Sequence, residues 1–176
     1  KRVSIDDIIK STKPIILSGD AGAGKSTFLK KIGEQLIALN VDENTTTRNI
    51  PVYISAMEIY EENYNIESLV LKKLSVFFGF ENLSETSNSY NIFLLIDSID
   101  EFSEEEQRSL LRKMHKLSED YKLRYVVSSR NSDKMESLSD SIFESYHIEK
   151  FNTEQVKKFI SKFFLGENAK TESLLE

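Results

Sequence analysis

The segment Gly19-Asp-Ala-Gly-Ala-Gly-Lys-Ser-Thr27 matches the pattern G-x-x-x-x-G-K-[ST] in full. The apolar run Pro14–Ser18 before it has the length of a short strand, and the residues from Lys25 to Leu39 place hydrophobic side chains on one helical face. A glycine-rich turn with an unrelated lysine would not need this strand and helix around it. Motif and context therefore agree, and together they predict a strand that leads into a phosphate-binding loop and a helix.

Each residue type in this loop has a physical role in holding phosphate. Glycines let the backbone turn tightly with its N–H groups pointing inward, and the following helix presents its positive end to the same anion. Lys25 supplies a mobile charge for the β- and γ-phosphates, and Ser26 supplies a hydroxyl for Mg²⁺. We therefore expect nucleotide contacts from Gly19, Asp20, Ala21, Gly22, Ala23, Gly24, Lys25, Ser26 and Thr27.

A cluster of carboxylates follows the apolar strand Ile92–Asp97. Asp97 is the first polar residue after the apolar run, where a carboxylate can hold Mg²⁺ together with Ser26. Asp100 and Glu101 come just beyond the strand, at the carboxyl edge where ligands bind in such sheets. Either one could orient or deprotonate an attacking water. The plainer alternative is that Asp100 and Glu101 are solvated or cap the next helix.

Arg130 is the third candidate element of the site. It follows the predicted strand Leu123–Ser129, so it too is expected at a carboxyl edge of the sheet. A positive group at that place can sense the γ-phosphate of a nucleotide. The alternative is an arginine on the surface without a role. The predicted catalytic set is thus Asp100, Glu101 and Arg130, and the predicted metal ligands are Ser26 and Asp97.

Strand-like and helix-like segments alternate along the chain, which is typical of an α/β fold with a parallel sheet covered by helices on both faces. Strands are predicted at Pro14–Ser18, Val52–Ala56, Ile92–Asp97, Leu123–Ser129 and, more weakly, Glu144–Glu149. Helices are predicted at Lys25–Leu39, at Ile66–Phe78, after the capping box at Ser103, and at Thr153–Phe164. Polar loops are expected at about Asn40–Asn49 and Glu81–Asn91.

Length and composition bound the remaining possibilities. The 176 residues are expected to form one nucleotide-binding domain, and because the chain begins without Met we interpret it as a fragment. No apolar run approaches the roughly 18 residues of a membrane span, so no membrane partner is expected. The net charge of −6 argues against non-specific nucleic-acid binding. The absence of Cys excludes disulfides and is compatible with the cytoplasmic location that we expect.

These motifs together resemble those of NACHT domains, which belong to the STAND class of P-loop NTPases and are related to AAA+ proteins. The resemblance is carried by the phosphate loop, by Leu94-Leu-Ile-Asp-Ser-Ile-Asp-Glu101 and by Val127-Ser-Ser-Arg130. A small residue, Ser98, follows the metal-binding Asp and precedes an acidic pair, whereas AAA+ proteins usually place Asp and Glu side by side. The similarity covers about Pro14 to Phe164.

The resemblance implies more than the residues alone. It implies a five-stranded sheet in the order 5-1-4-3-2, with the strand before Arg130 between those of Gly19 and Asp97. It implies ATP and ADP with Mg²⁺ as cofactors, and a switch that self-associates in the full-length protein and signals in immune or antiviral defence. Bacterial members take part in antiviral defence, and this chain resembles them.

Several functions remain open from the sequence. A self-sufficient ATP hydrolase and a slow nucleotide-gated switch would use the same residues, so only a rate separates them. A small-molecule kinase is disfavoured by the extra strand Val52–Ala56 between the two nucleotide motifs and by the acidic pair after Asp97. A GTPase is disfavoured because the chain has no Asn-Lys-x-Asp motif, but no residue was identified that reads adenine. His115 and His147 do not have metal-ligand spacing.

Overall fold

The computed structural model describes residues 4–41, 48–130, 142–150 and 152–163. Within these ranges, five parallel strands form one sheet in the order β2-β3-β4-β1-β5. The strands are β1 (Ile15–Ser18), β2 (Arg48–Ser55), β3 (Tyr90–Asp97), β4 (Arg124–Ser129) and β5 (Glu144–His147). Read in reverse, this order is 5-1-4-3-2, so the sheet expected from the resemblance is confirmed.

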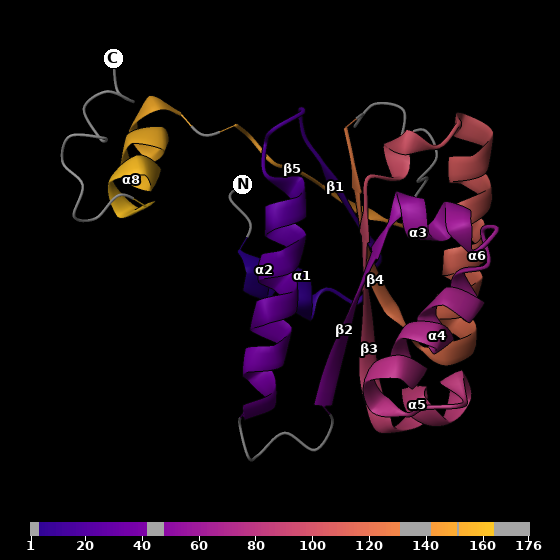
Figure 1. Ribbon diagram of the computed structural model, residues 1–176. Coiled ribbons are helices and arrows are strands. Elements are labelled where there is room, and N and C mark those ends of the chain that lie inside the picture. The colour runs from indigo at the N-terminus through magenta and orange to yellow at the C-terminus, as the bar shows by residue number, and fades with distance from the viewer. Residues whose placement is uncertain (1–3, 42–47, 131–141, 151, 164–176) are drawn as a thin grey trace.

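Helices cover both faces of the sheet, which gives three layers (Figure 1). One face carries α1 (Ile5–Lys10) and α2 (Lys25–Ala38), and the other carries α3 (Ala56–Glu61), α4 (Ile66–Phe78), α5 (Leu83–Ser89) and α6 (Glu104–Tyr121). The last described helix, α8 (Thr153–Phe163), lies apart from these layers in Figure 1. Two short 3₁₀ helices span Leu39–Val41 and Ile99–Glu101.

The strands divide the core into two halves because successive side chains point to opposite faces. On β3, Leu94 and Ile96 are buried under α4 and α6, whereas Phe93 and Leu95 are buried under α2. The central strands β1 and β3 are therefore apolar on both faces, as parallel strands covered by helices usually are. The edge strand β2 instead alternates between buried and more exposed residues. Along β3 and β4, the two-residue period of a strand places every second side chain on the face covered by α2. That helix begins at the phosphate loop.

Two local predictions were wrong near β2 and β3. The predicted loop Glu81–Asn91 contains helix α5, which begins because the Asn82 side chain accepts from the backbone N–H groups of Ser84 and Glu85. The second strand begins at Arg48, four residues before the predicted start at Val52. It ends at Ser55, one residue before the predicted end at Ala56. Of the predicted loop at Asn40–Asn49, residues 42–47 lie outside the described ranges.

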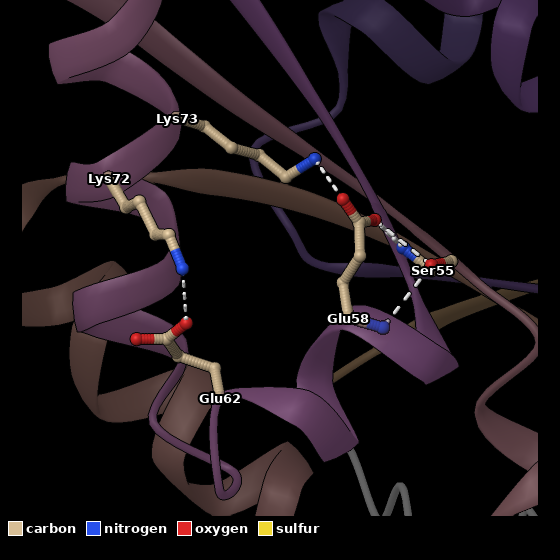
Figure 2. A network of polar contacts seen from close by, with 5 residues as sticks. All are labelled: Ser55, Glu58, Glu62, Lys72 and Lys73. Carbon is tan, nitrogen blue, oxygen red and sulfur yellow. Dashed lines mark hydrogen bonds and ion pairs between the residues drawn. The ribbon is translucent and has the colours of Figure 1, made fainter.

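The strand β2 ends at Ser55 because a capping box starts α3 there (Figure 2). Glu58 accepts from the backbone and the hydroxyl of Ser55, and the Ser55 hydroxyl accepts from the backbone of Glu58. Lys73 of α4 contacts the other Glu58 oxygen at 2.5 Å, and Lys72 contacts Glu62 at 3.1 Å. These pairs attach α4 to the carboxyl end of β2.

The ends of two further elements also differ from expectation. The helical period of Ile66–Phe78 places Phe77 and Phe78 on the same side as the buried Leu74, but they are 76% and 56% exposed. They belong to the last turn of α4, where they line a pocket together with Pro51 and Val52 of the edge strand. The last helix begins after Asn152, whose side-chain oxygen accepts from the backbone N–H of Gln155, while Phe164 lies outside the described residues. In the part of the chain that the structure describes, no helix is long and apolar enough to span a bilayer.

Candidate functional site

The phosphate loop lies between the carboxyl end of β1 and the first turn of α2, as the motif requires. Gly22 and Gly24 adopt positive φ angles of 75° and 92°, which L side chains rarely adopt, so glycine is favoured at both positions. Gly19 is needed for a different reason. A Cβ at Gly19 would lie 2.7 Å from the carbonyl oxygen of Ile148, the residue after β5, so the loop begins in contact with that backbone.

Lys25 is 9% exposed, and its ammonium lies against the loop's own backbone. Nζ donates to the carbonyl oxygens of Gly19 at 2.6 Å and of Asp20 at 2.9 Å. An ammonium carries three N–H donors, so it can give the third to a phosphate oxygen without leaving these carbonyls. The structure thus holds the positive charge of Lys25 inside the loop.

Asp97 ends β3; the residue is 7% exposed and both carboxylate oxygens accept hydrogen bonds. The hydroxyl of Ser128 donates to Oδ1 at 2.5 Å, and the hydroxyl of Tyr53 donates to Oδ2 at 2.5 Å. Ser128 also accepts from the backbone N–H of Ser98, a residue in the left-handed conformation with φ 62°. The Asp97 carboxylate is therefore fixed by hydroxyls from the two neighbouring strands, β2 and β4.

Sequence reasoning missed Tyr53 and Ser128. Leu95 pairs with Tyr53 on one side and with Val126 on the other, so Ser128 lies level with Asp97 and Tyr53 lies one side-chain step before it. A long aromatic side chain can reach such a diagonal neighbour. All three side chains point to the α2 face, which alternation along each strand could have indicated once the strand order was known.

The electrostatics of this group favour a charged Asp97 beside neutral donors. Burial raises the pKa of Asp97, but the hydroxyls of Ser128, Ser26 and Tyr53 and the charge of Lys25 outweigh it and hold the pKa below its ordinary value. Burial and the neighbouring Asp97 raise the pKa of Tyr53 well above its ordinary value. Tyr53 is therefore a protonated donor, and Asp97 keeps its negative charge.

The donor set fits Mg²⁺, a hard cation that prefers oxygen ligands. Ser26 and Asp97 offer hard oxygen ligands, and the Ser26 hydroxyl is close enough to lower the pKa of Asp97. Among the described residues, no group of three His, Cys, Asp or Glu side chains could hold a metal ion. Mg²⁺ commonly binds through one or two carboxylates plus substrate phosphates, so one carboxylate beside a phosphate loop suits it.

Asp100 and Arg130 are brought together by the structure. Asp100 lies in the 3₁₀ helix Ile99–Glu101 after β3, and Arg130 follows β4, the next strand in the sheet. The backbone N–H of Arg130 donates to Asp100 Oδ1 at 3.0 Å, and Arg130 Nε lies 3.3 Å from Oδ2. Both were predicted at the carboxyl edge, and the contact between them was not predicted.

Glu101 is not brought into this group. It is exposed, and no hydrogen bond to its side chain joins it to Asp97 or Asp100 among the described residues. Its position beside the strand end keeps it available to a water or ligand from outside the fold. Asp100, whose two oxygens contact residue 130, is arranged to hold Arg130 and less suited than Glu101 to take a proton.

The end of β5 forms the other wall of the loop. Ser18 lies within 3.1 Å of His147 Nδ1, and the backbone N–H of Ile148 donates to the Ser18 carbonyl at 2.8 Å. Lys150 contacts Asp20 at 3.0 Å and lowers the pKa of that carboxylate. These contacts hold the outer side of the phosphate loop against the segment after β5.

Comparison with known proteins places this arrangement in context. A family model described as the NACHT domain matches residues 13–167. The comparison with curated proteins found no match.

Solved structures of ATPases share the fold. The structure of Drosophila ORC bound to DNA is 14% identical, with a TM-score of 0.61, and covers 98% of this chain and 50% of its own. Domain III of the Thermotoga maritima replication initiation protein DnaA is 18% identical, with a TM-score of 0.57, covering 93% of this chain and 68% of its own. The FIGL-1 AAA domain in complex with ADP is 17% identical, with a TM-score of 0.57, covering 96% and 55%.

At these identities the likeness shows the fold alone. The chain spans about half the length of the structures it matches, with 42%, 50% and 55% of three of them covered.

Proposed function

Because the chain belongs to the NACHT family of STAND P-loop NTPases, we propose that it binds ATP and ADP with Mg²⁺ and acts as a nucleotide-dependent switch for signalling and self-association. The observation that carries the proposal is the meeting of Lys25, Ser26 and Asp97 at the carboxyl edge of β1 and β3. Lys25 would supply a positive charge for phosphate, and Ser26 and Asp97 would supply two oxygen ligands for Mg²⁺. Nucleotide binding itself follows from the P-loop NTPase fold.

Each residue of the site would have its own role in holding the nucleotide and the metal. The backbone of the loop and Lys25 bind the phosphates, and Ser26 and Asp97 would hold the metal. Held by these two residues, Mg²⁺ would supply positive charge that offsets the negative charge of the phosphates. Arg130 would contact the γ-phosphate from the end of β4, and Glu101 would orient the attacking water. Asp100 positions Arg130.

A switch is favoured over a fast hydrolase by the small number of cations that we assign to the γ-phosphate. Among the described residues these are Lys25, which lies against the loop carbonyls, and Arg130, which Asp100 holds at the end of β4. A site with few cations for the γ-phosphate hydrolyses slowly until another is supplied. With slow hydrolysis, bound ATP persists long enough for the ATP and ADP forms of the protein to act as two distinct states.

The biological setting of the switch is a further part of the proposal. Signalling in immune or antiviral defence and a cytoplasmic location are suggested by the NACHT family alone. Some structural neighbours were solved with DNA, but that is a property of those proteins. The net charge of −6 disfavours non-specific nucleic-acid binding by this chain.

The test is nucleotide-dependent stabilisation of the 176-residue chain. ATP or ADP with Mg²⁺ at about 100 times its dissociation constant should add about 2.7 kcal/mol to the free energy of unfolding. Lys25→Ala should remove most of this increment, and Asp97→Asn should remove the part that depends on Mg²⁺. An equal increment in the Lys25→Ala protein would show that this loop does not hold the phosphates.

A further inference from the structure

Tyr53 gives the metal-binding carboxylate a contact that the nucleotide motifs do not explain. It lies on β2, outside both motifs, and its hydroxyl donates to Asp97 Oδ2 at 2.5 Å. The ring is half-buried against the α2 half of the core, with the Lys30 ammonium 5.8 Å from its centroid. A phenylalanine would fill the same space, so packing alone does not account for the hydroxyl.

The chemistry of the two donors to Asp97 also points to a role in metal binding. Tyr53 and Ser128 are neutral, and each donates to a different oxygen of the carboxylate. The ionised carboxylate has about four lone-pair directions, so beside the hydroxyls of Ser128, Tyr53 and Ser26 it keeps one for another partner. A cation such as Arg in either place would cancel the charge that attracts Mg²⁺. Two neutral donors fix the plane of the carboxylate and leave its charge intact.

We propose that Tyr53 is a positioning residue for the metal site: its hydroxyl, together with that of Ser128, orients Asp97 and thereby determines how strongly Mg²⁺ supports nucleotide binding. The inference rests on the proposed function. Ser128 is fully buried and also accepts from the Ser98 backbone, so it ties Asp97 to the turn after β3. Tyr53 is the donor that approaches from the other side of β3.

The test compares Tyr53→Phe with Tyr121→Phe, a matched control. Tyr121 also donates to a carboxylate, Glu67, at 2.6 Å, but it ends α6. It is the last of the 18 residues of α6, so it lies about 26 Å along the helix from the end near the site, at 1.5 Å per residue. Binding of ADP and ATP is measured by calorimetry in excess chelator and then across a Mg²⁺ titration.

We expect Tyr53→Phe to bind metal-free ADP as the wild type does, within about twofold. The Mg²⁺ concentration that gives half of the metal-dependent gain in affinity should rise about 10- to 100-fold, the usual effect of losing an outer-shell partner. Ser128→Ala should shift in the same direction, and Tyr121→Phe should not shift. A purely structural role would instead lower the metal-free and metal-dependent affinities together.

The outcomes separate this inference from the proposed function. A wild-type protein whose nucleotide binding ignores Mg²⁺ would overturn both. A wild-type protein that responds to Mg²⁺, with Tyr53→Phe matching the Tyr121→Phe control, would overturn the positioning role alone. An unfolded Tyr53→Phe protein, or one with metal-free affinity reduced as much as the metal-dependent gain, would show that the hydroxyl is structural and would also overturn it.

Discussion

Asp100 holds Arg130 by two contacts, from the backbone N–H to Oδ1 at 3.0 Å and from Nε to Oδ2 at 3.3 Å. The side chain of Asp100 is 10% exposed and that of Arg130 is 58% exposed, so the carboxylate is sheltered and the guanidinium faces solvent. The turn after β3 and the end of β4 are thereby joined. Asp100 thereby determines where the guanidinium lies at this edge of the sheet.

The first prediction is that Asp100 and Arg130 act as a unit in turnover. Asp100→Asn and Arg130→Gln should each lower the rate of ATP hydrolysis, and the double variant should be hardly slower than the more damaging single one. The physical reason is that either change loses the same positioned cation. Exposed ion pairs are worth only about 0.2–1 kcal/mol of stability, so all three proteins should stay folded under assay conditions.

A double-mutant cycle on the hydrolysis rates measures the coupling. The effects of independent substitutions on the activation free energy add within about 0.3–0.5 kcal/mol. Additive effects of this kind would show that Asp100 does not act through Arg130 and would favour a water-orienting role for Asp100. Glu101→Gln serves as the reference variant, because Glu101 is exposed and does not contact Arg130. Its loss of turnover should add fully to that of Arg130→Gln.

The sequence predicted the parts of this site that local pattern determines. The phosphate loop, Asp97 and Arg130 each end a strand or begin a helix, so periodicity along the chain was enough to put them at one edge of a parallel sheet. The contacts of Tyr53 and Ser128 with Asp97 depend on which strands are neighbours and which face each residue takes. Strand order is not encoded in local periodicity, so the residues alone did not identify these two side chains. The order implied by the NACHT resemblance, combined with alternation along each strand, could have indicated them.

The misjudged segments have local causes. The helices α3 and α5 are six and seven residues long, too short for an apolar period to stand out, and they begin at capping residues Ser55 and Asn82. Phe77 and Phe78 follow the helical pattern of Leu74 in sequence, but the last turn of α4 lies at the edge strand β2, where both side chains line an open pocket with Pro51 and Val52. Helical periodicity gives the direction of a side chain, and it does not reveal where the sheet beneath it ends.

The second prediction concerns pH and Glu58, which caps α3 and pairs with Lys73 (Figure 2). Burial raises the pKa of Glu58, but the contacts with Lys73 and Ser55 outweigh it and hold the pKa below its ordinary value of 4.5. A carboxylate with a lowered folded pKa stabilises the protein above its unfolded pKa, and this stabilisation is lost as the pH falls through the folded value.

Glu58→Gln keeps a side chain that can cap the helix and removes only the charge. The wild type should therefore exceed Glu58→Gln in stability by about 0.2–1 kcal/mol near neutral pH, and the difference should vanish as the pH falls below 4.5. Urea denaturation at a series of pH values measures it. Glu34→Gln, which removes an exposed pair with Lys31, is the control. A difference that grew with acid would contradict the assignment.

The third prediction concerns Gly19, where the phosphate loop meets the segment after β5. Gly19→Ala would put a Cβ 2.7 Å from the Ile148 carbonyl oxygen. The backbone N–H of Ile148 donates a hydrogen bond to the Ser18 carbonyl, so this backbone cannot easily move away. We expect a loss of about 1–3 kcal/mol of stability, the usual cost of overpacking, together with weaker nucleotide binding because the loop shifts.

Gly33→Ala provides the matched control for this change. Its Cβ would lie 3.2 Å from Leu95 Cδ1, the movable end of a side chain, and alanine favours the helix α2. Guanidinium denaturation and nucleotide titration of both variants give the comparison. If Gly19→Ala bound nucleotide as tightly as Gly33→Ala, the contact with Ile148 would not shape the phosphate loop.

The last prediction is that the 176-residue chain binds nucleotide but hydrolyses ATP very slowly as a monomer. Among the described residues, the cations that we assign to the γ-phosphate are Lys25, which lies against the loop carbonyls, and Arg130, which Asp100 positions. A cation supplied in trans to such a site is worth about 10³ to 10⁵ in rate. A partner subunit is a natural source of that cation, and the net charge of −6 disfavours spontaneous pairing of this chain in dilute solution. Phosphate release should therefore stay low per molecule, and it should rise with protein concentration only where light scattering detects larger species. Raised salt should promote that assembly by screening the repulsion. Turnover of about 1 s⁻¹ or faster, within the ordinary enzyme range, from a sample that light scattering shows to be strictly monomeric would exclude the switch and establish a self-sufficient hydrolase.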